Sequence, residues 1–197
     1  MLPYRFGINS SIRDDLIENH TTEIAKNLFD SHEHLFLICD GTYARHQKSS
    51  NNEFQRKTYS GQKKVSLCKP FTICTTDGYV FDMLGPYPAN LNDAEILRSL
   101  LQDPNALCKL LKENNILVLD RGFRDLKDEL ELKKIRVLMP ALKGKRKQLT
   151  TKESNESRYV RKIRWAVEAV HGIIKQKYRL LDHKLDNKML PKIGTYF

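Results

Sequence analysis

The stretch from Arg158 to Tyr178 reads RYVRKIRWAVEAVHGIIKQKY and contains no proline. Its apolar residues recur with the period of an α-helix and form one stripe: Val160, Ile163, Val167, Val170, Ile174 and Tyr178. Along the edge of this stripe lie Arg161, Arg164, Glu168 and Lys175. The pattern predicts a long amphipathic helix that packs on a core and carries one acid among cations. Taken alone, such a flank is typical of a solvated surface.

The composition indicates a single domain with a basic surface. A chain of 197 residues is long enough for a real core. The net charge of +10 predicts a polyanionic partner, with nucleic acid the first candidate, although solubility alone also accounts for such a charge. The widely spaced Cys39, Cys68, Cys74 and Cys108 are expected to be reduced and mostly buried thiols rather than zinc ligands. The sequence contains no apolar run of about 18 residues, so no membrane span is predicted, and no N-terminal signal pattern is present.

The first half of the chain is expected to form helices followed by strands. The predicted elements are helices within Ser11–Asp30, a buried strand at His34–Cys39, a long ordered loop over 41–62, and strands at Lys64–Thr75 and Tyr79–Leu84. Pro70 predicts an edge or a bulge, and Asp77-Gly78 predicts a hairpin turn. The sequence Gly85-Pro86-Tyr87-Pro88 is expected to end the last of these strands.

The second half alternates helices with strands. The predicted elements are a helix capped by Asn92 or Asp93 and running to Leu101, a short helix at Pro104–Lys112, a strand at Ile116–Leu119, a helix at Phe123–Lys133, a strand at Ile135–Met139, the basic segment 143–147, and the long helix. This order of elements predicts the α/β class, with a mixed central sheet flanked by helices.

Two of the predicted buried strands end in an aspartate, Asp40 and Asp120. If these strands are neighbours, the two carboxylates lie side by side and repel each other unless a cation neutralises them. Carboxylate oxygens suit Mg²⁺ or Mn²⁺, and Glu168 on the long helix adds a third acid. Three carboxylates can hold two metal ions about 3.5–4 Å apart, an arrangement used for phosphodiester cleavage. Each aspartate taken singly is more commonly a turn former.

The same residues lie within motifs of a known family. The motifs are Cys39–Tyr43 (CDGTY), Gln55–Ser60 (QRKTYS), Gly85–Tyr87 (GPY) with Asn92–Ala94 (NDA), Leu119–Phe123 (LDRGF) and Arg164–Glu168 (RWAVE). Over most of residues 35–181 the chain resembles the DDE-superfamily endonuclease domains of Harbinger-type and related insertion-sequence transposases. The resemblance implies a ribonuclease H-like fold. It also implies a two-metal DNA nuclease and strand-transfer enzyme with the catalytic and metal-binding triad Asp40, Asp120 and Glu168.

The resemblance extends to DNA contacts on the long helix. The spacing of Arg164, Glu168 and Lys175 is similar to a signature helix of related DDE transposases, in which Arg and Lys contact phosphates near the cut. The aromatic residue that opens this signature would fall at position 161, where this chain has Arg161. Further candidate phosphate contacts lie in the predicted loop, namely Lys48, Arg56, Lys57, Lys63 and Lys64.

Other residues near these motifs keep a structural explanation. Asp93 is explained as a residue at a helix N-terminus, and its approach to the metals is left open. His171 is expected to be a partly exposed helical histidine that could contact the site. Trp165 is expected to anchor a core or an interface rather than to stack on a base.

The resemblance divides the chain into 1–32, a helical remnant of an N-terminal region, and 33–197, an endonuclease domain that ends short of the family's usual length. The alternative function is therefore a domesticated or truncated, catalytically inactive remnant that binds DNA or a partner. Double-stranded DNA is the expected partner. A separate DNA-recognition protein and a homo-oligomer are left open, no membrane is expected, and the location is expected to be nuclear or otherwise intracellular.

A third class of function is rejected. The stretch Leu35–Thr42 (LFLICDGT) resembles the first motif of haloacid-dehalogenase-type phosphatases. Those enzymes place a nucleophilic aspartate two residues before the Asp-Gly-Thr, and here that position is Ile38.

Overall fold

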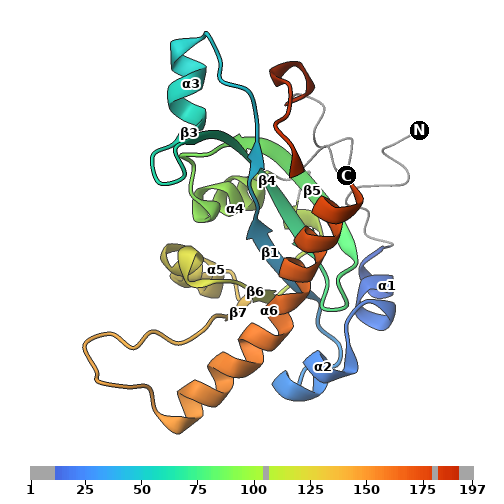
Figure 1. The fold of residues 1–197 in the computed structure, drawn as a ribbon. Coiled ribbons are helices and arrows are strands. Elements are labelled where there is room, and N and C mark those ends of the chain that lie inside the picture. The colour runs from blue at the N-terminus through green and yellow to red at the C-terminus, as the bar shows by residue number, and fades with distance from the viewer. Residues whose placement is uncertain (1–11, 104–106, 179–181, 191–197) are drawn as a thin grey trace.

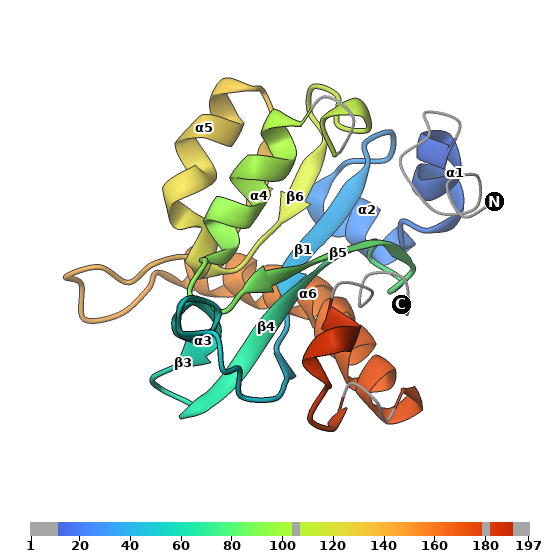
Figure 2. The ribbon, with the colours of Figure 1, turned by 90° about the horizontal axis from the view of Figure 1, so that it is seen from above.

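A mixed β-sheet forms the centre of the molecule, with helices on both faces (Figures 1 and 2). The computed structural model describes residues 12–103, 107–178 and 182–190, and within them the sheet has seven strands. The order β2-β4-β1-β6-β7 comprises β2 (Ala44–Arg45), β4 (Val65–Cys74), β1 (Phe36–Gly41), β6 (Ile116–Val118) and β7 (Arg136–Leu138). Strands β3 (Tyr59–Ser60) and β5 (Val80–Pro88) also pair with β4. This arrangement confirms the predicted α/β class with a mixed central sheet flanked by helices.

The direction of the strands divides the sheet into two parts. Strands β1, β6 and β7 are parallel, whereas β4 runs antiparallel to β1 and β5 antiparallel to β4. The hairpin between β4 and β5 turns at Asp77-Gly78, as predicted, and Gly78 adopts a φ of 89° that favours glycine. Strand β1 thus joins the antiparallel part to the short parallel part, and it is the middle strand of the order β2-β4-β1-β6-β7.

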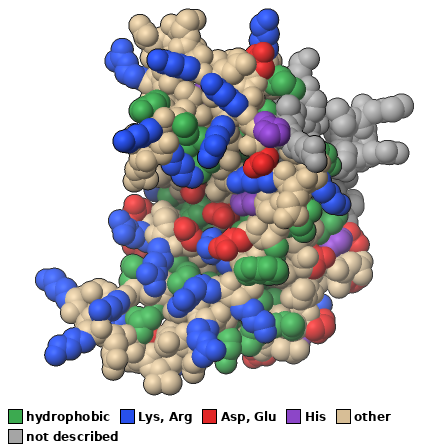
Figure 3. Space-filling model, viewed as in Figure 1, with side chains coloured by type: hydrophobic (Ala, Val, Ile, Leu, Met, Phe, Trp, Pro, Cys, Tyr) green, Lys and Arg blue, Asp and Glu red, His purple; other side chains and the backbone are tan. Residues whose placement is uncertain are grey.

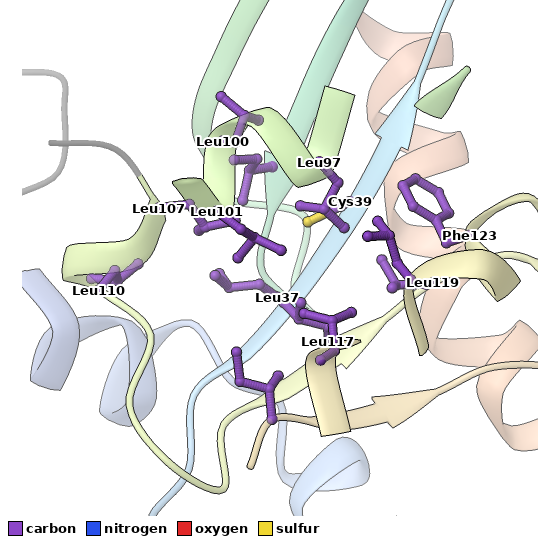
Figure 4. Close-up of a cluster of buried hydrophobic side chains, with 14 of the residues drawn as sticks. Leu37, Cys39, Leu97, Leu100, Leu101, Leu107, Leu110, Leu117, Leu119 and Phe123 are labelled. Atoms are coloured by element: carbon purple, nitrogen blue, oxygen red, sulfur yellow. The ribbon is translucent and has the colours of Figure 1, made fainter. Parts of the chain in front are cut away.

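Each face of the parallel strands packs against its own layer of helices. Because side chains alternate along a strand, Phe36 and Ile38 of β1 lie on one face with Ile116 and Val118 of β6, against the long helix α6 (Thr151–Lys177). The residues between them face the other layer, which includes α4 (Asp93–Gln102). This second core contains Leu37, Cys39, Leu97, Leu100, Leu101, Leu107, Leu110, Leu117, Leu119 and Phe123 (Figure 4).

Helix α6 begins at Thr151 rather than at the predicted Arg158. A capping box starts it: the Thr150 hydroxyl accepts from the Glu153 N–H at 3.2 Å, and the Glu153 carboxylate accepts from the Thr150 N–H at 2.9 Å. Arg146 of the basic segment also binds the Glu153 carboxylate, at 2.9 Å. The first turns of the helix are polar, and for this reason the apolar period did not reveal them.

The apolar stripe of α6 is buried over most of its length. Val160, Ile163, Val167 and Val170 are buried, whereas Tyr178 at the end of the helix is half exposed. Trp165 is 65% exposed, so of its two predicted roles the core anchor is wrong, whereas the interface anchor stays a prediction. The helix therefore presents a tryptophan on its outer side.

Residues 41–62 are not the predicted loop without secondary structure. They contain β2, β3 and the helix α3 (Asn52–Thr58). Asn51 begins α3, because its side-chain oxygen accepts from the Phe54 N–H at 3.0 Å. This segment projects from one end of the sheet (Figure 1).

The prolines of the antiparallel strands have two different positions. Pro70 lies within β4, a strand with partners on both sides, where the pairing with β5 shifts between Lys69 and Phe71. The predicted bulge is confirmed there, and the predicted edge is wrong. Strand β5 continues through Pro86 to Pro88, so the predicted end at Gly85 is also wrong. Among the described residues β5 pairs only with β4, and an outer strand tolerates proline.

The remaining helices agree broadly with the sequence patterns. The N-terminal helices are α1 (Ile12–Asn19) and α2 (Glu23–Phe29), and their Leu16, Ile17 and Ala25 pack into the two cores. Asn92 and Glu95 form the predicted capping box of α4. The turns after it are 3-10 helix η2 (Leu107–Lys109), 3-10 helix η3 (Arg121–Leu126) and α5 (Lys127–Leu132). The predictions for 1–11, 104–106, 179–181 and 191–197 lie outside the described residues.

Two expectations from composition can be compared with the structure. Cys39, Cys68 and Cys74 are buried free thiols, and Cys108 is exposed. No helix in the described part of the chain has the length and apolarity needed to cross a membrane.

Candidate active site

Asp40 and Asp120 lie level with each other at the ends of adjacent parallel strands. Ile38 of β1 pairs with Val118 of β6, and each aspartate follows two residues later. The alternation that turns Ile38 and Val118 toward α6 also assigns both aspartates to this face. Figure 3 shows acidic side chains gathered near the middle of this side of the molecule, with Lys and Arg side chains around them.

Asp120 also has the turn-forming role that is common for an aspartate after a strand. Its Oδ1 accepts a hydrogen bond from the Gly122 N–H at 2.6 Å and caps η3. This bond fixes the orientation of the carboxylate and uses one lone pair of one oxygen, so further acceptor positions remain on the group. A structural and a chemical role are compatible in the same side chain.

Arg164 connects the aspartate of β1 with the glutamate of α6. Its Nη1 lies 3.6 Å from Asp40 Oδ2, and its Nη2 donates to Glu168 Oε1. Arg164 and Asp40 are largely buried, whereas the Glu168 side chain is 51% exposed. Glu168 thus faces the site from the helix and reaches Asp40 through the guanidinium group.

The electrostatics of Asp40 show that several acids share this site. The pKa of Asp40 is raised to about 7, mainly by burial, and the nearby Arg164 opposes this rise. The charges of Asp120, Asp93 and Glu168 contribute to the rise. A cation placed among these carboxylates would therefore be attracted by all of them.

Asp93 approaches the site from the start of α4. A Cβ atom on Gly41, the residue after Asp40, would lie 2.5 Å from Asp93 Oδ1, so Asp93 packs directly on the backbone of β1. The Nζ of Lys69 lies 3.0 Å from the same oxygen and donates its hydrogen bond to Leu91 O at 2.6 Å. Lys69 is almost fully buried. Asp93 is therefore both a residue of the helix N-terminus and a neighbour of Asp40.

His171 lies on α6 one helical turn after Glu168, and it borders Asp40. Its Nε2 lies 2.9 Å from Thr72 Oγ1, and its Nδ1 lies 4.0 Å from Asp40 Oδ2. Burial, helped by the charges of Lys175 and Arg164, lowers the pKa of His171 to about 4. The ring is neutral at pH 7, and its proximity to Asp40 is a polar contact rather than an ion pair. The sequence had predicted a partly exposed histidine, whereas only 11% of this side chain is exposed.

The donor set can be compared with the needs of a divalent metal. Asp40, Asp120 and Glu168 offer the hard carboxylate oxygens that Mg²⁺ and Mn²⁺ prefer. Within the described ranges, no three acidic, histidine or cysteine side chains form a ready group of ligands. Arg164 contacts both Asp40 and Glu168. The donors fit the metal chemically, and Glu168 would have to exchange its guanidinium partner for the ion.

The predicted DNA contacts fall into two groups. Arg56 and Lys57 are exposed on α3, where Lys57 pairs with Glu53 at 2.6 Å. Lys63 lies 4.4 Å from the centre of the Tyr43 ring, and Lys64 is exposed. The second group is on α6. Lys175 is partly buried and lies beside His171. Arg164 is paired with carboxylates.

The roles of Lys69 and Gly41 were not predicted from the sequence. A signal for Lys69 was present, since it is the single charged residue in the strand VSLCKPFTIC. A lone cation in a buried strand needs a partner, and the partner here is Asp93. Gly41 carried no such signal, because its small size matters only once Asp93 is placed against it.

Comparison with known proteins identifies the family. A family model described as DDE superfamily endonuclease matches residues 39–197, which include all three acids. The chain therefore belongs to the DDE superfamily endonucleases, and the mixed sheet agrees with the ribonuclease H-like fold that the resemblance implied. The structure is similar to that of a piggyBac transposase in a synaptic complex with hairpin DNA, with a TM-score of 0.49 and 11% identity. That similarity covers 91% of this chain and 49% of the transposase chain, about half its length. No curated protein matches.

Proposed function

We propose that this protein is a divalent-metal-dependent DNA endonuclease of the transposase type, with Asp40, Asp120 and Glu168 as its catalytic carboxylates. One observation carries the proposal. The register of β1 and β6 sets Asp40 and Asp120 side by side, on the face that α6 covers with Glu168. Membership of the DDE superfamily endonucleases supports the same assignment.

Asp40, Asp120 and Glu168 would hold Mg²⁺ or Mn²⁺ in a two-ion site. When bound, such ions activate a water molecule and stabilise the leaving oxygen of a phosphodiester. The residues around them have their own tasks. Arg164, released from Glu168, would neutralise a phosphate oxygen. Neutral His171 fills the space beside Asp40 and is oriented by Thr72, while Lys69 holds Asp93 against β1.

The proposed reaction has two stages. In the first, water attacks a phosphorus of double-stranded DNA, the bond to the 3′ oxygen breaks, and a 3′-hydroxyl and a 5′-phosphate are released. In the second, this 3′-hydroxyl attacks a phosphodiester of target DNA and a second 3′ oxygen leaves. Arg56, Lys57, Lys63, Lys64 and Lys175 are proposed phosphate contacts. Such a substrate implies a location where the protein meets DNA, in the nucleus or elsewhere inside the cell.

The test is nicking of supercoiled plasmid DNA by the purified chain with Mg²⁺, with Mn²⁺ and with a chelator. We expect nicking that requires the metal and that falls by on the order of 100-fold or more in Asp120→Asn. Asp125→Asn is the matched control, because Asp125 is an exposed aspartate of the same η3 segment that pairs only with Arg124 at 3.5 Å among the described residues. Nicking by Asp120→Asn at the wild-type rate would overturn the triad.

The second candidate function is DNA or partner binding without cleavage. The position of Arg164 between Asp40 and Glu168 favours it, because a guanidinium already supplies the positive charge there. This candidate predicts DNA binding that weakens with salt and no nicking in either metal. Absence of DNA binding even at low salt would contradict both candidates.

A further inference from the structure

A basic cavity lies apart from the acids, against the outer strand β2. Its volume is about 530 Å³, within the range of ligand sites. Its walls come from three parts of the chain: Arg45–Lys48, the segment from Gln55 to Ser66, and Asp182–Lys184. None of the acids of the candidate active site lines it. The cavity is therefore a separate feature of the same domain.

Four cations converge on this cavity from three segments. Arg45, Lys48, Lys64 and Lys184 line it, and all four are exposed. In the part of the chain that the structure describes, none of them forms an ion pair, and the lining contains one acid, Asp182. Four positive charges held near a single acid attract an anion. The lining thus indicates an anionic ligand.

The wall made by Asp182–Lys184 is fixed by backbone hydrogen bonds between Leu185 and the residues in and just after β2. The Leu185 N–H donates to Arg45 O at 2.8 Å, and the Gln47 N–H donates to Leu185 O at 2.9 Å. His46 Nδ1 lies 2.8 Å from both Gln47 O and Asn187 Oδ1. These oxygens are acceptors, so Nδ1 carries the proton. The cavity is preformed by contacts between distant parts of the sequence.

One further side chain suits a nucleotide rather than a simple ion. Tyr59 is 46% exposed and adds an aromatic ring to the lining, on which a base can stack. Cations beside an exposed aromatic ring are the combination with which proteins bind single nucleic-acid strands.

We propose that this cavity binds a phosphate-bearing segment of single-stranded DNA, with Arg45, Lys48, Lys64 and Lys184 on phosphates and Tyr59 against a base. The proposal rests on the proposed function only in taking DNA as the ligand. It adds an anchoring site at the outer strand β2, where a strand separated from the duplex would be held during the reaction. An acidic polypeptide is the competing occupant, and the test below separates the two.

The experiment measures binding of a fluorescent single-stranded oligonucleotide by anisotropy at several salt concentrations. For the double variant R45A/K184A we expect affinity to fall about ten-fold or more at low salt. The slope of log K against log salt should fall by about 0.7 for each phosphate that the variant no longer neutralises. The matched control is K109A/K133A, which removes two exposed lysines, the second of them just before β7 at the opposite edge of the sheet. Thermal melting of each variant, and the single variant K184A, separate a defect in binding from a defect in folding.

A second comparison tests the aromatic ring. Tyr59→Phe should keep single-strand binding near the wild-type level, whereas Tyr59→Ala should weaken it about five-fold or more without changing the salt slope. Equal binding by Y59A and wild type would overturn the stacking role. Poly-glutamate that displaces the oligonucleotide at equal charge concentration would overturn the choice of nucleic acid.

The outcomes for the cavity and for the proposed function are distinguishable. If R45A/K184A binds DNA as K109A/K133A does, the cavity proposal fails, whether or not the wild type nicks DNA. If the wild type never nicks DNA but R45A/K184A no longer binds single strands, the cavity proposal holds and the proposed nuclease fails.

Discussion

The guanidinium group of Arg164 lies 3.6 Å from the carboxylate of Asp40 and links it to Glu168 on the same helix as itself. In this arrangement a protein cation stands where the proposed function requires a divalent one. The contact between Arg164 and Asp40 therefore bears both on the stability of the folded site and on the proposed binding of a metal ion there. It can be examined without measuring catalysis.

Replacement of Arg164 should make the protein more responsive to metal. Arg164→Gln leaves Asp40 near other acids without its cation, so we expect the free energy of unfolding to fall by roughly 2 kcal/mol. Added Mg²⁺ or Mn²⁺ should then raise the melting temperature more in the variant than in the wild type. Lys162→Gln, at an exposed position of α6, is the control. An equal metal-induced shift in all three proteins would contradict the proposed competition between Arg164 and the ion.

The raised pKa of Asp40 predicts how stability changes with pH. Burial raises this pKa from 3.8 to about 7, so between these values the folded protein holds a proton that the unfolded chain has released. The contribution of Asp40 to the free energy of unfolding of the metal-free protein should therefore decrease as pH rises from about 4 to about 7. The lowered pKa of His171 acts in the opposite direction between about 4 and 6.5, so the effect of Asp40 is measured as the difference between the wild type and Asp40→Asn. Asp40→Asn stays neutral and should be more stable than the wild type at pH 8, by about 2–4 kcal/mol. Parallel stability curves for the two proteins over this range would contradict the buried environment of Asp40.

Gly41 should be intolerant of a side chain because Asp93 packs on it. In Gly41→Ala, the new Cβ would lie 2.5 Å from Asp93 Oδ1 and 3.1 Å from Lys69 Cδ. We expect a decrease of about 1–3 kcal/mol in the free energy of unfolding, measured by urea denaturation. Gly61→Ala is the control, because a Cβ there meets no atom within 4 Å.

A double-mutant cycle with Asp93→Ala tests the cause of that decrease. If the clash with Asp93 is responsible, Gly41→Ala should cost clearly less in the Asp93→Ala background. A cost that is the same in both backgrounds would show that Asp93 does not rest on Gly41.

The start of α6 depends on its capping box. Thr150→Ala removes the acceptor for the Glu153 N–H and should lower the free energy of unfolding by about 1 kcal/mol. Thr151→Ala changes an exposed residue of the first turn and should have an effect close to zero. Equal effects of the two substitutions in thermal melting would contradict the cap.

Much of the fold and of the acid positions could be predicted because they follow from periodicity. The buried runs that end at Asp40 and Asp120 are strands, and alternation along them places both acids on the α6 face. Helix α3 was missed because its seven residues carry no apolar stripe, and only the cap at Asn51 marks its start. The predicted β5 ended too early because Pro86 was expected to end the strand. A proline interrupts a strand only where its missing N–H would be needed for pairing.

The contacts inside the site could be predicted only in part. The spacing of Arg164 and Glu168, four residues apart on one helix, is typical of an ion pair, yet the resemblance directed attention to DNA phosphates instead. The contacts of Lys69 with Asp93 and of His171 with Asp40 join residues that are distant in the sequence. Such contacts depend on how strands and helices pack, which no local pattern encodes.

The most direct test of the central claim is the rate of metal-dependent DNA nicking by Glu168→Gln. Glu168 is half exposed and its ion pair is with Arg164 of the same helix, so the variant should fold as the wild type does, which thermal melting can verify. The account predicts a rate reduced by on the order of 100-fold or more, because the third metal-binding carboxylate is removed. Nicking by the wild type that persists at the same rate in Glu168→Gln would contradict it.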